Sequence, residues 1–219
     1  WKRETFITEE LISNLCYKVV PISNPRLKAG FIEVVEGAET VENLYNKNRI
    51  YKPEQHKFND LANSLRWGGT DYVRICASAI ATFVSMFVLA IGDRHQGNIM
   101  LAIDHTFFNI DFGYSFGESV FLNDTWDFPI PFFLRDYLKQ NEAFETFIGE
   151  CWNAMQTLKD NTRIFEILAA RFMKDPIKFK KAKNVFLYYL NTTWITFYCK
   201  MTAGSYTALP KYVMHNWNK

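Results

Sequence analysis

One uncharged apolar run, at residues 75–91, constrains the fold more than any other feature of the chain. A membrane-spanning helix needs about 20 predominantly apolar residues, and this run is shorter, contains three hydroxyl side chains and ends just before Asp93. A helix that is apolar on all sides belongs in the middle of a domain. The sequence therefore predicts a buried core helix over about 71–91.

Composition supports one globular domain over residues 1–219. The chain is 48% hydrophobic and 17% aromatic, which favours a large core and argues against disorder. A formal net charge of +2 is too small to indicate nucleic acid as a partner. No signal peptide is visible, and the chain begins at Trp1. We therefore expect a piece of a longer protein.

The four cysteines lie far apart and form no CxxC pair: Cys16, Cys76, Cys151 and Cys199. This spacing argues against zinc and favours a reducing intracellular compartment. We expect a cytoplasmic protein, at endomembrane surfaces if its substrate is a lipid.

The expected fold is α+β and mostly helical. Predicted strands, in two antiparallel pairs, cover residues 16–22 with 31–35 and 98–103 with 107–110. Besides the core helix, helices are predicted to start at Thr8 and Thr40 and to cover 132–139, 142–158, 161–173 and 177–200. Loops are predicted at 46–56 and 111–131, and a loop as long as the second is usually functional.

The chemistry-bearing residues follow the core helix. Asn98 and Asp111 lie at the two ends of the hairpin 98–110, and oxygen ligands of this type hold magnesium that bridges nucleotide phosphates. Asp93 and His95 lie beside them and can accept a hydroxyl proton. This combination predicts a kinase-type site.

The order of these motifs resembles one family. Residues 92–98 read G-D-R-H-x-x-N and residues 110–113 read I-D-F-G, similar to the phosphoinositide 3-kinases, phosphoinositide 4-kinases and related large protein kinases. Residues 30–40 resemble the hinge of that family and the start of its next helix. The resemblance covers about residues 16–135.

The resemblance also implies catalytic and metal-binding roles for individual residues. It implies that Asp93 and His95 are the catalytic pair and that Asn98 and Asp111 bind Mg²⁺. Arg94 is interpreted as structural, tying this loop to the segment that follows Asp111.

The resemblance also implies an ATP site. The backbone of Val35 would pair with adenine, with Glu33 beside it, and Met100 and Ile110 would form the apolar floor under the base. For Met100 and Ile110, ordinary core packing is an equally simple interpretation.

The same resemblance implies the C-lobe of a kinase-like fold, with a hinge strand at about 31–35 and the C-lobe over 36–219. No glycine-rich phosphate loop is visible, and Lys18 lies just before the hinge, where it cannot act as the phosphate lysine. We therefore expect the N-lobe to be absent from this chain and further domains or subunits to act as partners.

The segment after Asp111 bears on the substrate. Residues 114–131 contain three acids and no Lys or Arg, which disfavours a bisphosphorylated lipid. Phosphatidylinositol or a protein hydroxyl fits better. Residues 113–117 resemble vacuolar-type phosphatidylinositol 3-kinases, whereas residues 96–98 resemble the 4-kinases.

Three functions stay open. The first is ATP- and Mg-dependent phosphotransfer to phosphatidylinositol; the others are a catalytically inactive scaffold and a related protein Ser/Thr kinase. Five lysines near the last predicted helix suggest a solvated face or peripheral contact with anionic lipid: Lys174, Lys178, Lys180, Lys181 and Lys183. Residues 212–219 suggest membrane contact or simple packing.

Overall fold

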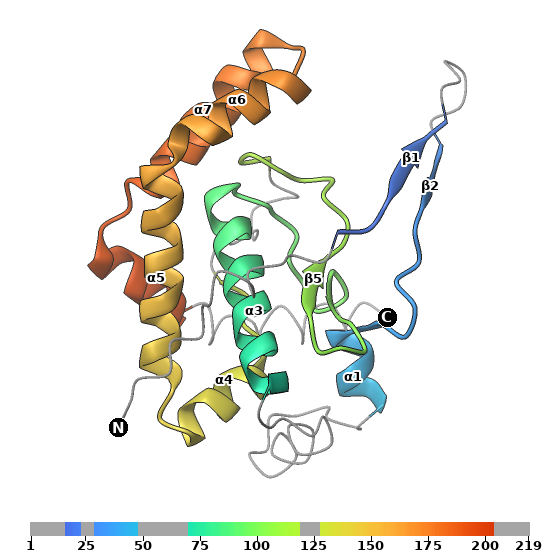
Figure 1. Ribbon diagram of the computed structural model, residues 1–219, viewed down its shortest axis with the longest axis vertical. Helices are drawn as coiled ribbons and strands as arrows, with labels where there is room; N and C mark the ends of the chain where they lie inside the picture. Colours follow the sequence, from blue (N-terminus) through green and yellow to red (C-terminus); the bar gives the residue numbers. More distant parts are fainter. Residues whose placement is uncertain (1–15, 23–28, 48–69, 119–127, 204–219) are drawn as a thin grey trace.

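The computed structural model describes residues 16–22, 29–47, 70–118 and 128–203. The helix expected from Thr8, residues 48–56 of the expected loop and the closing segment 212–219 lie outside these residues. The described part is mostly helical with two small antiparallel sheets (Figure 1).

The strands are β1 (Val19–Pro21), β2 (Gly30–Ile32), β3 (Glu39–Thr40), β4 (Ile99–Leu101) and β5 (Phe107–Asn109). The helices are α1 (Val41–Lys47), α3 (Thr70–Val88), α4 (Phe132–Gln140), α5 (Phe144–Asp160), α6 (Thr162–Phe172) and α7 (Pro176–Leu190), and residues 194–203 are also helical.

Helix α3 lies at the centre of the molecule. Helices α5 and α7 pack on one side of it and β5 on another (Figure 1). Over residues 75–84 its side chains are buried around the whole circumference, including Ile75, Ile80 and Phe83, each at most 2% exposed. Burying each such side chain contributes about 1.5–3 kcal/mol. The predicted core helix is therefore confirmed, and in the described part of the chain no helix is long and apolar enough to cross a membrane.

Aromatic rings join the C-terminal helices to this core. The Phe87 ring stacks on Phe128 at 4.7 Å and meets the edge of Phe197 at 5.8 Å between centroids. Trp152 of α5 contacts Phe197 at 5.3 Å. Such pairs add about 0.5–1.5 kcal/mol each beyond their buried area.

Strands β1 and β2 form a hairpin that projects from the rest of the molecule (Figure 1). Val19 pairs with Ile32 and Val20 with Phe31, so the predicted pairing is confirmed. The expected hinge strand 31–35 is shifted: β2 begins at Gly30 and ends at Ile32. Beyond Ile32 only the Glu33 amide continues the ladder, to the Lys18 carbonyl.

The second sheet has the order β3-β4-β5 and carries the site. The side chains of Ile99, Leu101 and Phe107 are buried. The Phe107 amide donates to Ser78 Oγ at 3.0 Å, and Thr82 Oγ1 donates to the Phe107 carbonyl at 3.2 Å. The hydroxyl groups of the apolar run therefore fix the sheet to α3.

The prediction of one helix over 177–200 is wrong. Helix α7 ends at Leu190, three non-helical residues follow, and a new helix covers 194–203. Asn191 caps the first helix with its backbone amide, and Thr193 Oγ1 accepts from the Thr196 amide at 3.3 Å. These polar residues interrupt the helix because their side chains and amides bond locally.

Candidate functional site

The segment after Asp111 returns alongside the end of α3. The Gly92 amide donates to the Tyr114 carbonyl at 2.8 Å, and the Phe116 amide donates to the Leu89 carbonyl at 2.9 Å. The chain leaves α3 through Ala90, whose φ is 46°. These hydrogen bonds hold the end of α3 and the segment after Asp111 side by side, although the β4–β5 hairpin separates them in the sequence.

Arg94 holds these segments together. Its side chain is 4% exposed and donates to four carbonyl groups. Two are at 2.8 Å, on Gly92 and Ile110; the Asn98 carbonyl is at 3.4 Å, and the fourth belongs to Asp111. Guanidinium is suited to such a task because its five donors form a rigid planar fork. The structural interpretation of Arg94 is confirmed.

Asn98 and Asp111 both lie at the open end of the hairpin. The Ile110 amide donates to the Asn98 carbonyl at 3.1 Å, which closes the ladder there. Asn98 Nδ2 donates to the Asp93 carbonyl at 2.8 Å, so Oδ1 is the side-chain atom of Asn98 that could bind a metal ion. Asp111 Oδ1 accepts from the Gly113 amide at 3.1 Å, and the residue is exposed.

The donor set at this end fits magnesium. Within the described ranges, no group of three or more His, Cys, Asp or Glu side chains could hold a metal ion. Magnesium is commonly held by one or two protein oxygens together with substrate phosphates, rather than by an all-protein cage. Asn98 and Asp111 supply two such oxygens.

Asp93 and His95 lie on the loop between α3 and β4, and both are half-buried. Asp93 has φ of 56° and Asp111 has φ of 55°, in the left-handed region. Non-glycine residues held there cluster at functional sites. His95 Nδ1 accepts from the Gly97 amide at 3.0 Å, which places the proton of the neutral ring on Nε2.

Gly97 lies close to both Glu42 and His95, a packing arrangement that the sequence did not indicate. A Cβ on Gly97 would lie 2.9 Å from Glu42 Oε2 and 2.9 Å from His95 Cε1. Glu42 is 8% exposed, and its amide donates to the Gln96 carbonyl at 3.0 Å. Glu42 is an acid in the first turn of a short helix, where it is ordinarily explained by its interaction with the helix dipole. The sequence therefore offered no reason to expect Glu42 beside His95.

The expected adenine-binding residues occupy two places. Met100 pairs with Phe108 across the ladder, and Ile110 follows two residues later, so Met100 and Ile110 share the face opposite the core. Both are half-buried. Glu33 and Val35 lie on the connection from β2 to β3. Their roles toward adenine stay predictions.

Hydrogen bonds hold the connection between β2 and β3. Glu33 Oε2 accepts from the Lys18 amide at 2.7 Å, which anchors Glu33 to the segment leading into β1. The Val35 carbonyl accepts from the Ala38 amide at 3.3 Å across a turn at Gly37, whose φ is 69°. Among described residues, none accepts a hydrogen bond from the Val35 amide.

Tyr17 is a further residue that the sequence did not indicate. Its ring meets the edge of Phe108 at 6.1 Å, beside a cavity of about 410 Å³ that reaches Met86 and Phe112. Burial raises the pKa of the Tyr17 hydroxyl, the Asp111 carboxylate raises it further, and the Arg94 guanidinium opposes both. Tyr17 therefore lies within electrostatic reach of the metal-binding end.

The chain is similar to a family of known proteins. The model of the phosphatidylinositol 3- and 4-kinase family matches residues 51–179, which include the catalytic and metal-binding candidates but not Glu33 or Val35. A probable phosphatidylinositol 3-kinase VPS34 homolog of Encephalitozoon cuniculi is 26% identical over 178 residues, covering 76% of this chain and 37% of that protein.

Two Dictyostelium discoideum proteins are also similar. Phosphatidylinositol 3-kinase 3 is 26% identical over 175 residues, and phosphatidylinositol 3-kinase 1 is 27% identical over 165 residues. The alignments cover 73% and 68% of this chain but 10% of each relative, so the chain spans only part of the relatives it matches. Since the family model matches more than half of the chain, the protein belongs to the phosphatidylinositol 3- and 4-kinase family.

Proposed function

We propose that this chain is the C-lobe of a lipid kinase that transfers the γ-phosphate of ATP to a hydroxyl of phosphatidylinositol. The observation that carries the proposal is the cluster held by Arg94, which joins the loop of Asp93 and His95 to the end of the hairpin that bears Asn98 and Asp111. Phosphoryl transfer depends mainly on such positioning and on charge stabilisation.

Each residue then has a defined task. Asn98 and Asp111 would hold Mg²⁺, which supplies positive charge that offsets the charge of the phosphates. Asp93 and His95 lie on the loop beside them. The Asp93 carboxylate would accept the proton of the attacking hydroxyl, and His95, whose Nε2 carries the ring proton, would donate a hydrogen bond to the charge that develops on the transferred phosphate. Arg94 acts as a positioning residue because its donors are used by backbone carbonyls.

ATP would lie against the hairpin face that carries Met100 and Ile110. That face also carries the Asn98 side chain, two residues before Met100, so the base and the phosphates would share one surface. The Val35 amide would donate to adenine, and Glu33 fixes the connection that presents it.

The acceptor is proposed to be a lipid. The relatives reported above carry names of phosphatidylinositol 3-kinases, which supports phosphatidylinositol over a protein hydroxyl. Work on a lipid would place the protein at a cytoplasmic membrane surface as a peripheral partner.

The test is transfer of labelled phosphate from ATP by the full-length protein, with phosphatidylinositol vesicles and a serine peptide as alternative acceptors. Asp111→Ala should lower turnover at least about 10²-fold, as expected for loss of a group that acts on transition-state charge. Asp104→Ala is the control, because Asp104 is exposed and pairs only loosely with Arg74 at 3.5 Å. Unchanged turnover in Asp111→Ala would refute the proposal. Labelling of the peptide alone would favour a protein kinase, and no transfer by the wild type would favour a scaffold.

A further inference from the structure

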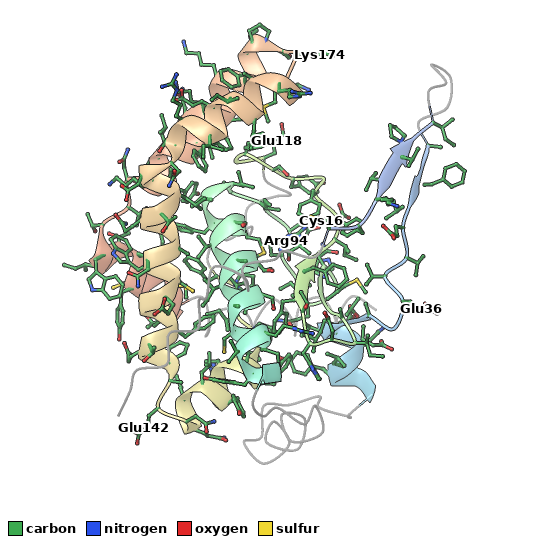
Figure 2. The ribbon with its side chains drawn as sticks, in the orientation of Figure 1. Cys16, Glu36, Arg94, Glu118, Glu142 and Lys174 are labelled. Atoms are coloured by element: carbon green, nitrogen blue, oxygen red, sulfur yellow. The ribbon has the colours of Figure 1, made fainter. Side chains whose placement is uncertain are left out.

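A groove of about 390 Å³ lies between the segment after Asp111 and the start of α7. One wall is formed by residues 112–118, beginning at Phe112 and Gly113. The other wall carries three lysines: Lys174, Lys178 and Lys181. In Figure 2, Lys174 lies at the upper tip of the α6–α7 pair and Glu118 on the loop beneath it.

The five clustered lysines do not lie on one face. Lys178 and Lys181 are three residues apart on α7 and so share a face, and Lys174 comes from the preceding connection. Lys183 instead pairs with Glu166 of α6 at 2.9 Å. Lys180 is exposed and does not line the groove. The fold therefore selects three of the five lysines and gathers them at one place.

Two of the three charges lack an ionic partner in the described part of the chain. Lys181 Nζ lies 3.8 Å from Glu118 Oε1, with both side chains more than half exposed. No carboxylate of the described residues lies within 4.0 Å of Lys174 or Lys178 Nζ. Asp175 lies in the same wall, but its Oδ1 accepts from the amides of Ile177 and Lys178 as the cap of α7. The groove thus keeps positive charge available for an anion.

The groove also opens beside the proposed reaction centre, because Phe112 and Gly113 directly follow Asp111. Residues 114–131 supply no Lys or Arg. Arg94 lies over the Phe112 ring, but it is buried and its donors are used by backbone carbonyls. Among the described residues, the exposed positive charge in this groove therefore comes from α7 and its preceding connection. We propose that this groove binds the phosphodiester of an inositol phospholipid headgroup, an inference that rests on the proposed lipid-kinase function.

An apolar side chain beside the lysines favours a lipid surface over a soluble anion. Ile177 lies between Lys174 and Lys178 in the sequence and is 81% exposed. Phe112, at the other wall, is 47% exposed. Lysines interleaved with exposed apolar side chains suit a lipid surface, where apolar groups enter the interface and lysines meet the headgroup phosphates.

The test compares two charge-matched variants of the full-length protein. Lys174→Gln/Lys178→Gln removes the two unpaired lysines of the groove. Lys159→Gln/Lys180→Gln removes two exposed lysines that do not line it and changes the net charge equally. Three quantities are measured: the apparent KM for phosphatidylinositol in phosphatidylcholine vesicles, ATP hydrolysis without lipid, and sedimentation with vesicles that contain phosphatidylinositol or phosphatidylserine.

The groove variant should raise the apparent KM about 25-fold, since each of its two lysines near an anionic surface contributes about a factor of five. Its lipid-free ATP hydrolysis should stay unchanged, and it should lose more binding to phosphatidylinositol than to phosphatidylserine. The control should match the wild type.

Equal behaviour of the two variants would overturn the proposal. So would an equal loss on both lipids, which would mean general attraction to anionic membranes. If the wild type transfers no phosphate, the proposed function fails, whereas the sedimentation arm still decides whether the groove binds the headgroup.

Discussion

The four-carbonyl contact of Arg94 gives the sharpest prediction about the site. Arg94→Gln removes the guanidinium from the carbonyls of Gly92, Asn98, Ile110 and Asp111. Hydrogen bonds from a charged donor contribute about 1.5–3 kcal/mol each, but they are not additive, and glutamine can replace one. The expected loss is therefore roughly 3 kcal/mol of local stability.

Amide hydrogen exchange in the full-length protein measures this loss directly. The amides of Gly92, Asn98 and Ile110 donate hydrogen bonds to backbone carbonyls of the segments that Arg94 joins. A loss of roughly 3 kcal/mol corresponds to an exchange rate about 10²-fold faster, if these amides exchange by local opening. The rate of phosphate transfer should also fall in this variant, because the loop of Asp93 and His95 and the hairpin end with Asn98 and Asp111 lose their relative positions.

Arg74→Gln is the matched control. Arg74 contacts Asp104 at 3.5 Å with both side chains 47% exposed, and such pairs contribute about 0–1 kcal/mol. Exchange of the loop amides should not change in this variant. If Arg94→Gln left their exchange within about threefold of the wild type, the carbonyl contacts would not hold the site together.

Two further variants and measurements on the unmutated protein test the packing of the fold. Gly97→Ala should lower kcat on the order of tenfold with little change in melting temperature, because its Cβ would lie 2.9 Å from Glu42 Oε2; steady-state kinetics measures this, and an unchanged kcat would contradict it. Tyr45→Phe should destabilise the fold by about 1–3 kcal/mol, seen in thermal unfolding, because the buried amide that starts α4 would lose its acceptor at 3.0 Å. Burial raises the pKa of Cys76 to about 12, so the folded protein keeps this thiol protonated, and stability should fall as pH rises from about 9 toward 12. At pH 8.5, iodoacetamide should modify exposed Cys16 and spare Cys76, as peptide mass spectrometry would show; equal modification would contradict the burial.

The sequence predicted the elements whose signals are local. The uncharged run was identified as a buried helix because no other element of that length can be apolar on every side. The hairpin that carries Asn98 and Asp111 followed from two apolar strands around a short polar turn. Its residues are close in sequence, so their pairing needs no long-range information.

The parts that the sequence missed depend on distant contacts. Glu42 precedes His95 by more than 50 positions, and only the pairing of β3 with β4 brings them together. The division of the last helix at residues 191–193 had a signal, two threonines after an asparagine, but helical periodicity on both sides masked it. The gathering of Lys174 with the segment after Asp111 has no sequence signature, because it depends on how α7 packs.

The left-handed backbone at Asp93 and Asp111 has a consequence for protein engineering. A stability-guided redesign would favour glycine at both positions, because glycine adopts φ near 55° without steric penalty. Each replacement would relax the backbone and at the same time delete a carboxylate that the proposed chemistry requires. Stability alone is therefore a misleading objective at these two positions, and a thermostable version of this domain should be sought by leaving both aspartates fixed.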